Sequence, residues 1–196
     1  MEYDVILLEN GAKYLAETEL NDLTNKLKKS NIELKTMRID GPKNSLNDIS
    51  IFIGGHITEL IITGLLIPTA YDVLKSSLKF IVYKIKENVK IIQSGKVREA
   101  QPCIQFKTCN GEIIAPIPQN LSESQFDKYM DGVWQAVHAI KPNPEKKYES
   151  FIIEQNEDSL HIEAKTMLQY AQEQYNKQEQ RKSNSANIKV RNNYSK

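Results

Sequence analysis

The chain has 196 residues, of which 40% are apolar, enough for one core domain with an appendage. It holds 26 lysine and arginine residues against 25 aspartate and glutamate residues, so the formal net charge is only +1. This balance excludes the global basic excess that is typical of nucleic-acid-binding proteins, and any electrostatic partner must be recognised by a local patch. The N-terminus, MEYDVILLEN, carries acids and no basic leader. We therefore expect no secretory signal and a cytoplasmic location.

The first predicted elements form a strand–helix–strand unit. Residues 3–8 are a continuous apolar run, which predicts a central strand buried on both faces. Leucines at helical spacing predict a helix over about 18–29, and residues 32–39 predict a second strand. Strand, helix and strand at these lengths indicate a split βαβ or parallel unit, followed by a turn-rich loop.

The most apolar part of the chain is IFIGGHITELIITGLLIPTA, residues 51–70. Its longest run without a charge or a histidine is shorter than the roughly 20 residues that a membrane span needs, which favours a buried or interfacial helix. Apolar residues at heptad spacing extend the predicted helix over 58–86. Pro68 lacks an N–H and its ring collides with the carbonyl of Gly64, so we expect a helix kinked there or two helices.

The two halves of this predicted helix offer different surfaces. The first half is apolar on every side, and a chain of this size has few layers with which to surround it. We therefore predict an interaction surface for a second copy or another protein, made of Ile61, Ile62, Leu65 and Leu66. The second half, 72–86, carries lysines opposite its apolar seam. They predict a basic face for contact with a membrane surface, made of Lys75, Lys79 and Lys86.

Two glycines precede this helix. Gly54 and Gly55 can expose backbone N–H groups, which makes them a candidate anion site. The alternative is a plain glycine-rich turn, because the chain has no GxGxxG or GxxxxGKS/T pattern. His56 and Glu59 have the spacing of metal ligands on one helix face. No second ligand pair appears elsewhere, so we predict neither a metal site nor a cofactor.

A β-hairpin is predicted over 103–117, with Asn110 and Gly111 as its turn. This turn puts one apolar face together: Ile104, Phe106 and Thr108 opposite Ile117, Ala115 and Ile113. Regular pairing should end near Ala115, because the prolines beyond it have no N–H to donate. Cys103 and Cys109 would be about 20 Å apart on the first strand, so we expect free thiols and no shared zinc.

The core domain should close with a helix over 122–140. Ser122 begins it, and Gln125 completes a capping box. The KPNP segment after this helix cannot continue it and indicates a boundary. We therefore predict a core domain of residues 1–140 and a linker over 141–149.

The C-terminal extension is predicted to have two parts. Residues 150–182 should form a hairpin turning near Asn156–Asp158 and then a polar helix. That helix carries only a weak apolar stripe, made of Leu168, Ala171 and Tyr175. Residues 183–196 should be a disordered basic tail, because from Arg181 onward the chain has five positive charges and no acid. Such a tail can hold an acidic partner, RNA or an anionic membrane.

The remaining ionisable residues do not form a catalytic set in the sequence. His138 and His161 have no serine, cysteine or aspartate partner nearby in the chain. Glu163 and Lys165 follow a predicted hairpin that bears Asp158, a pattern similar to the acidic and lysine residues of restriction-type nucleases. Such a triplet arises readily by chance in a chain rich in glutamate and lysine, so we assign no catalytic residue.

In chain order the elements predict an α+β protein close to a split βαβ or ferredoxin-like arrangement. The segment GGHITELIITGLL and the later Asn-Gly hairpin resemble the small bacterial effector-associated constant component domains of conflict systems. The resemblance spans about residues 1–140. It implies an accessory or adaptor role beside an effector, with defence as the setting, and it carries over no catalytic residue.

Three functions are compatible with these patterns. The first is a non-enzymatic interaction module of a bacterial multi-component system, which binds a protein partner or itself through the apolar helix at 58–70. The second is a peripheral membrane protein that uses the basic face of helix 72–86 and the basic tail. The third is a small metal-dependent hydrolase or nuclease whose residues converge only in the folded chain. Nucleic acid is expected as a partner only through the basic tail.

Overall fold

The structure, a computed structural model, describes residues 4–39, 48–93, 95–108, 111–140, 149–155 and 162–193. In these ranges the chain is an α+β protein with five α-helices, a mixed seven-stranded sheet and a separate β-hairpin, which confirms the predicted class. The elements are β1 (Asp4–Glu9), a 3₁₀ turn η1 (Gly11–Lys13), α1 (Glu17–Lys28), β2 (Ile32–Met37), β3 (Ile49–Gly54), α2 (His56–Thr63), α3 (Pro68–Asn88), β4 (Lys90–Gln93), β5 (Lys96–Glu99), β6 (Pro102–Thr108), β7 (Gly111–Pro116), α4 (Glu123–Ala139), β8 (Glu149–Gln155), β9 (Ile162–Thr166) and α5 (Met167–Asn193).

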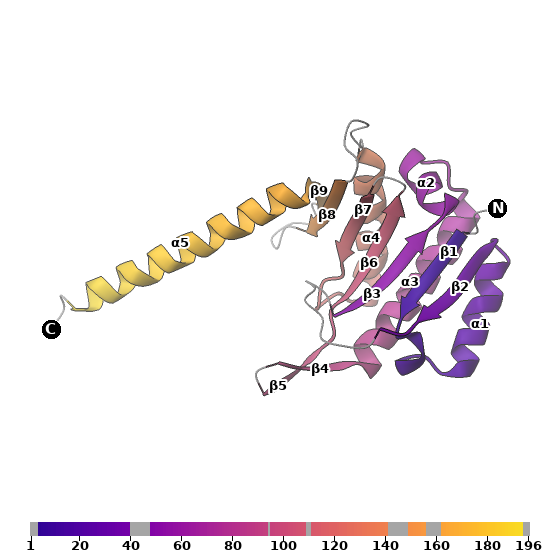
Figure 1. The fold of residues 1–196 in the computed structure, drawn as a ribbon, viewed down its shortest axis with the longest axis horizontal. Coiled ribbons are helices and arrows are strands. Elements are labelled where there is room, and N and C mark those ends of the chain that lie inside the picture. The colour runs from indigo at the N-terminus through magenta and orange to yellow at the C-terminus, as the bar shows by residue number, and fades with distance from the viewer. Residues whose placement is uncertain are drawn as a thin grey trace.

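The β1–α1–β2 unit forms as a parallel pair. The two strands are hydrogen-bonded neighbours, and α1 connects them with Leu23 and Leu27 buried. The sheet order is β2-β1-β3-β6-β7-β8-β9 (Figure 1). The predicted ferredoxin-like arrangement is not confirmed, because no strand lies between β1 and β2 as a split βαβ unit requires.

The sequence prediction missed strand β3, which pairs antiparallel with β1 and parallel with β6. Its pattern is the alternation of a half-buried strand, with Ile49, Ile51 and Ile53 in the core. The apolar run continues from this strand into α2 with no charged residue between them, so no change in composition separates the strand from the helix. The short hairpin of β4 and β5 was also missed.

The predicted helix over 58–86 is two helices, α2 and α3, with a bend of 113° between them. Gly64 ends α2 in the left-handed conformation, with φ of 71°. Pro68 is the first residue of α3, where a missing N–H costs no helical hydrogen bond. The predicted apolar seam is confirmed along α3, where its fully buried members are Leu74, Leu78, Ile81 and Ile85.

Helices α1, α3 and α4 lie on one face of the sheet, with α3 in contact with the other two (Figure 1). The main core fills the space between these helices and the sheet. The opposite face of the sheet carries a smaller apolar cluster of Cys103, Ile114 and Ile152, onto which the start of α5 packs. Strand β1 is not buried on both faces as predicted, because Val5 and Leu7 remain half-buried on this second side.

The predicted hairpin exists as β6 and β7, in a register shifted by two residues. Ile104 pairs with Ala115 and Phe106 with Ile113. The same residues share the apolar face as predicted, but each residue of β6 pairs with a residue of β7 two positions earlier than predicted. Pairing ends at Pro116, close to the predicted end. Residues 109 and 110 lie outside the described residues, so the position of Cys109 cannot be compared with its prediction. Cys103 is a buried free thiol.

The C-terminal extension continues the core sheet. Strand β8 pairs in parallel with β7, and β9 pairs antiparallel with β8, as the predicted hairpin requires. Ile153 belongs to the main core, so the predicted separation of this hairpin from the core is replaced by one continuous sheet. Of the predicted linker over 141–149, residues 141–148 lie outside the described residues, and Glu149 is the first residue of β8. Helix α5 runs to Asn193, through most of the stretch that we expected to be disordered.

Candidate functional site

The corner between α2 and α3, residues 64–68, is the strongest candidate for a functional surface. The N–H groups of the two residues after Gly64 both donate to the carbonyl oxygen of Leu60, at 2.9 and 3.1 Å. Pro68 then starts α3 in a new direction. The backbone of the corner is therefore fixed by hydrogen bonds and by its glycine and proline.

The corner turns large apolar side chains outward. Leu65 is 69% exposed and Ile67 is 63% exposed. Ile62 and Leu66 are partly buried and pack against the main core. Ile61 is fully buried, so this predicted interface residue is a core residue with no surface to offer a partner. Of the predicted apolar surface, Leu65 is therefore mostly exposed, and Ile62 and Leu66 are exposed only in part.

His138, in the last turn of α4, holds the corner from the side. Its Nδ1 lies 2.8 Å from the carbonyl oxygen of Ile62, one of the last carbonyls of α2. The imidazole also packs against Gly64, where an added Cβ would lie only 2.8 Å from the ring. His138, which has no catalytic partner near it in the sequence, thus links the end of α4 to the end of α2 in the fold.

Aromatic and charged groups flank the corner on the α3–α4 side. The rings of Tyr71 and Trp134 lie 4.6 Å apart, and the Tyr71 hydroxyl donates to Asp131. Lys75 also donates to Asp131, at 2.9 Å. Partial burial favours the neutral acid, but the bonds from Tyr71 and Lys75 outweigh it and hold the pKa of Asp131 below its usual value. Burial, with Asp131 beside it, raises the pKa of Tyr71.

The predicted basic face of α3 is used inside the protein. Lys75 pairs with Asp131, and Lys79 pairs with Asp127 of α4 at 3.0 Å. Lys86 is only 8% exposed and donates to the carbonyl oxygens of residues 118 and 119, both at 2.9 Å. Burial lowers the pKa of Lys86. The sequence did not indicate the ion pairs of Lys75 and Lys79, because the acids that they contact lie on α4, which is distant in sequence.

The candidate anion site at Gly54 and Gly55 is filled by the chain itself. Gly55 precedes α2 with φ of 87°, and the N–H of Ile57 donates to the Asp4 carboxylate. An aspartate at a helix N-terminus takes the place of an external anion. His56 is 3.4 Å from Glu59 on the exposed side of α2. Among the described residues, no three histidine, cysteine, aspartate or glutamate side chains gather closely enough to hold a metal ion.

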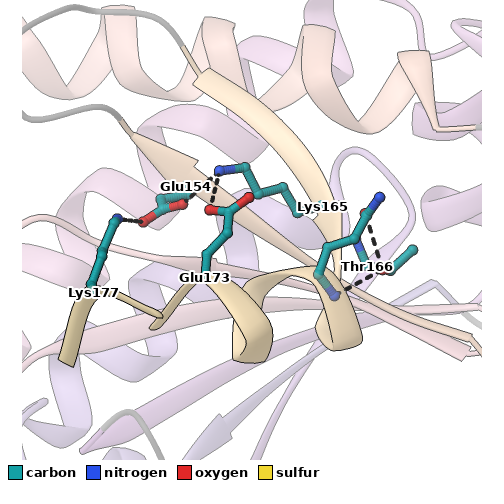
Figure 2. Close-up of polar contacts among 6 residues, drawn as sticks. Glu154, Lys165, Thr166, Glu173 and Lys177 are labelled. Carbon is teal, nitrogen blue, oxygen red and sulfur yellow. Dashed lines mark hydrogen bonds and ion pairs between the residues drawn. The ribbon is translucent and has the colours of Figure 1, made fainter. Parts of the chain in front are cut away.

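Of the nuclease-like pattern, Lys165 belongs to a structural ion-pair cluster with other acids. Lys165 contacts Glu154 at 3.1 Å and Glu173 at 2.7 Å, and Lys177 lies 3.6 Å from the other oxygen of Glu154 (Figure 2). Asp158 lies outside the described residues. The cluster joins β8 and β9 to the first turns of α5, so Lys165 anchors a helix in this structure.

A groove that the sequence did not predict lies where the parallel strands β1 and β2 end. Its volume is about 220 Å³. It is lined by the turn after β1 and by the end of β2: Asn10, Gly11, Ala12, Lys13, Thr36, Met37 and Arg38. Pockets for drug-sized ligands usually measure about 300–1,000 Å³, so this groove is the weaker candidate.

Comparisons with protein-family models, with curated proteins and with solved structures find no match for this chain. In the part of the chain that the structure describes, no single helix is long and apolar enough to cross a membrane. Helices α2 and α3 together pass that test of length and composition, as a strongly bent pair.

Proposed function

We propose that this protein is an interaction module that binds another protein through the α2–α3 corner. The observation that carries the proposal is the exposure of Leu65 and Ile67 on a backbone that hydrogen bonds and His138 hold in place. Burying one such side chain in a partner contributes about 1.5–3 kcal/mol. Because the backbone of the corner is already fixed, it loses little conformational freedom on binding, which lowers the cost of association.

The charges near the corner favour a protein with a basic rim over an anionic membrane. Glu59 of α2 is 60% exposed, Asp131 of α4 is 50% exposed, and Asp72 of α3 is exposed. The lysines that a membrane surface would need are engaged within the fold. An apolar pocket bordered by lysine or arginine would complement the corner in both shape and charge.

The setting we propose is that of an accessory or adaptor protein of a bacterial multi-component system. The resemblance of GGHITELIITGLL and the following hairpin to effector-associated constant component domains supports it. The GGHITELIITGLL segment runs from the end of β3 through α2 to the corner. The stretch that carries the resemblance is therefore the one that presents the binding surface.

A paired capture experiment in native cells tests the proposal. A photo-reactive amino acid is placed at position 65, and a second chain carries it at position 92, where Ile92 is 77% exposed on the β4–β5 hairpin. We expect a specific protein to be cross-linked from position 65 and not from position 92. That protein, purified, should bind the natural chain and the Ile92→Glu variant equally, and should bind Leu65→Glu at least about tenfold more weakly.

Two results would oppose the proposal. The first is the same set of cross-linked proteins from both positions, which would mark them as random neighbours. The second is equal binding of the purified protein to Leu65→Glu and to the natural chain, which would place the contact elsewhere.

A further inference from the structure

Asp131 is the last acidic residue of α4 before the corner. His138, about two helical turns further along α4, contacts Gly64 at the corner itself. On the facing helix α3, the Tyr71 hydroxyl donates to Asp131, and the Tyr71 backbone N–H donates to the carbonyl oxygen of Ile67 at 3.0 Å. A single turn of α3 therefore separates the exposed Ile67 from the tyrosine that holds Asp131.

One oxygen of the Asp131 carboxylate is open to a partner. Tyr71 and Lys75 both donate to Oδ1. Oδ2 accepts no hydrogen bond from the described residues, and the side chain is 50% exposed. Although partial burial opposes ionisation, the bonds from Tyr71 and Lys75 hold the pKa of Asp131 below its usual value, so the carboxylate is charged at neutral pH.

Lys75 does not cancel the negative charge on this side of the corner. Asp72, the residue after Tyr71, is exposed and has no ion-pair partner among the described residues. The first two turns of α3 and Asp131 together therefore set two acids against one lysine. The Lys75 side chain is only 19% exposed, and its ammonium lies 4.8 Å from the centre of the Tyr71 ring. A partner therefore meets more of the acid than of the lysine.

We propose that Oδ2 of Asp131 receives a lysine or arginine side chain of the protein that binds the corner, and that this contact selects the partner. The inference rests on the corner as the binding surface. Because Oδ1 already accepts two bonds, the contact is made by one N–H group and not by both arms of an arginine. A charge-assisted bond beside an apolar contact contributes specificity and rate of association more than affinity. The partner's pocket therefore carries its basic side chain on the α4 side of the corner.

The protein that is cross-linked from position 65, once purified, is the probe that tests this inference. Asp131→Asn removes the charge and keeps an oxygen that can accept the bonds from Tyr71 and Lys75, so the contact between α3 and α4 is preserved. This change should weaken binding by about threefold or more, and the remaining affinity should depend less on salt.

Asp127→Asn is the matched control. Asp127 is 46% exposed and pairs with Lys79, and it lies one turn of α4 further from the corner. Its change to asparagine should leave the affinity for the probe unchanged. Equal weakening by Asp127→Asn and Asp131→Asn would show only a general attraction between charges and would overturn the inference.

Replacement of each lysine and arginine of the probe by alanine identifies the cation. One replacement should weaken binding to the natural chain and cause no further loss with Asp131→Asn, as a double-mutant cycle requires of two groups in contact. Additive losses for every replacement would overturn the inference.

The failure of this inference is distinguishable from the failure of the corner. Equal affinity and equal salt dependence for the natural chain and Asp131→Asn, with weaker binding of Leu65→Glu, would overturn the role of Asp131 and leave the corner as the binding surface. Equal binding of Leu65→Glu and the natural chain would overturn both, and so would the absence of any specific protein cross-linked from position 65.

Discussion

A methyl group added at Gly111 should detach the C-terminal strands from the core sheet. Gly111 is the first residue of β7 and lies beside Glu149 of β8 in the parallel register. A Cβ there would lie 1.8 Å from the carbonyl oxygen of Glu149 and 2.8 Å from its carbonyl carbon. These are backbone atoms, which cannot rotate away, so β8 must move. The φ of Gly111, 154°, adds backbone strain.

The expected cost of Gly111→Ala follows from these contacts. Overpacking costs about 1–3 kcal/mol, backbone strain adds about 1–3 kcal/mol, and a lost ladder hydrogen bond adds about 1 kcal/mol. We therefore expect a loss of about 3–7 kcal/mol in the free energy of unfolding, a large part of the stability of an ordinary domain.

Two other glycines serve as controls for this change. Gly95 has φ of 75° and open space around it, so Gly95→Ala should show the backbone strain alone. At Gly54 an added Cβ would make only ordinary contacts, the nearest at 3.7 Å to Val5, so Gly54→Ala should be nearly neutral. Urea unfolding of the three variants gives the comparison. Equal losses for Gly111→Ala and Gly95→Ala would refute the β7–β8 register.

The remaining predictions concern the corner and the buried thiol. His138→Ala should lower the free energy of unfolding by about 1 kcal/mol, because its bond to the Ile62 carbonyl is lost. Gly64→Ala should be less destabilising in the His138→Ala background than in the natural chain, because the imidazole ring that the new Cβ would meet is absent. Additive losses of stability in urea unfolding would refute this contact. Ile61→Glu should abolish cooperative thermal unfolding, because it buries a charge, whereas Leu65→Glu should change stability by less than about 0.5 kcal/mol; equal effects would contradict their assigned exposures. Burial raises the pKa of the Cys103 thiol to about 12, so this thiol ionises at a lower pH in the unfolded chain than in the folded one. The free energy of unfolding should therefore fall as pH rises from about 9 towards 12, by up to about 1.4 kcal/mol per pH unit. The fall should be shallower in Cys103→Ala, and an unchanged slope would exclude the thiol as its cause.

The elements that short sequence patterns mark, namely amphipathic helices and a tight turn, could be predicted from the sequence. The spacing of leucines gave α1, the Asn-Gly pair gave the β6–β7 hairpin, and Ser122 with Gln125 gave the start of α4, where the capping box is present. Pro68 predicts a break or a kink, and the chain bends by 113° between α2 and α3 at that position. The hairpin register was displaced because an Asn-Gly pair predicts its own turn, whereas Gly111 pairs with Thr108 and belongs to the strand.

The features that the sequence did not predict depend on distant partners. Lys75 and Lys79 looked like a free basic face because their acids lie on α4, about 50 residues later. Ile61 and Leu65 are equivalent in a helical pattern, and only the end of α2 at Gly64 separates a core residue from a surface residue. The place of β8 in the core sheet follows from parallel pairing with β7, which leaves no local signature.

The affinity of the cross-linked and purified partner for three forms of the chain tests the central claim most directly. The forms are the natural protein, Leu65→Glu and Ile92→Glu, each first shown to be folded by its thermal transition. The corner as a binding surface predicts equal affinity for the natural chain and Ile92→Glu, and an affinity at least about tenfold lower for Leu65→Glu. Equal affinity for all three forms would contradict it.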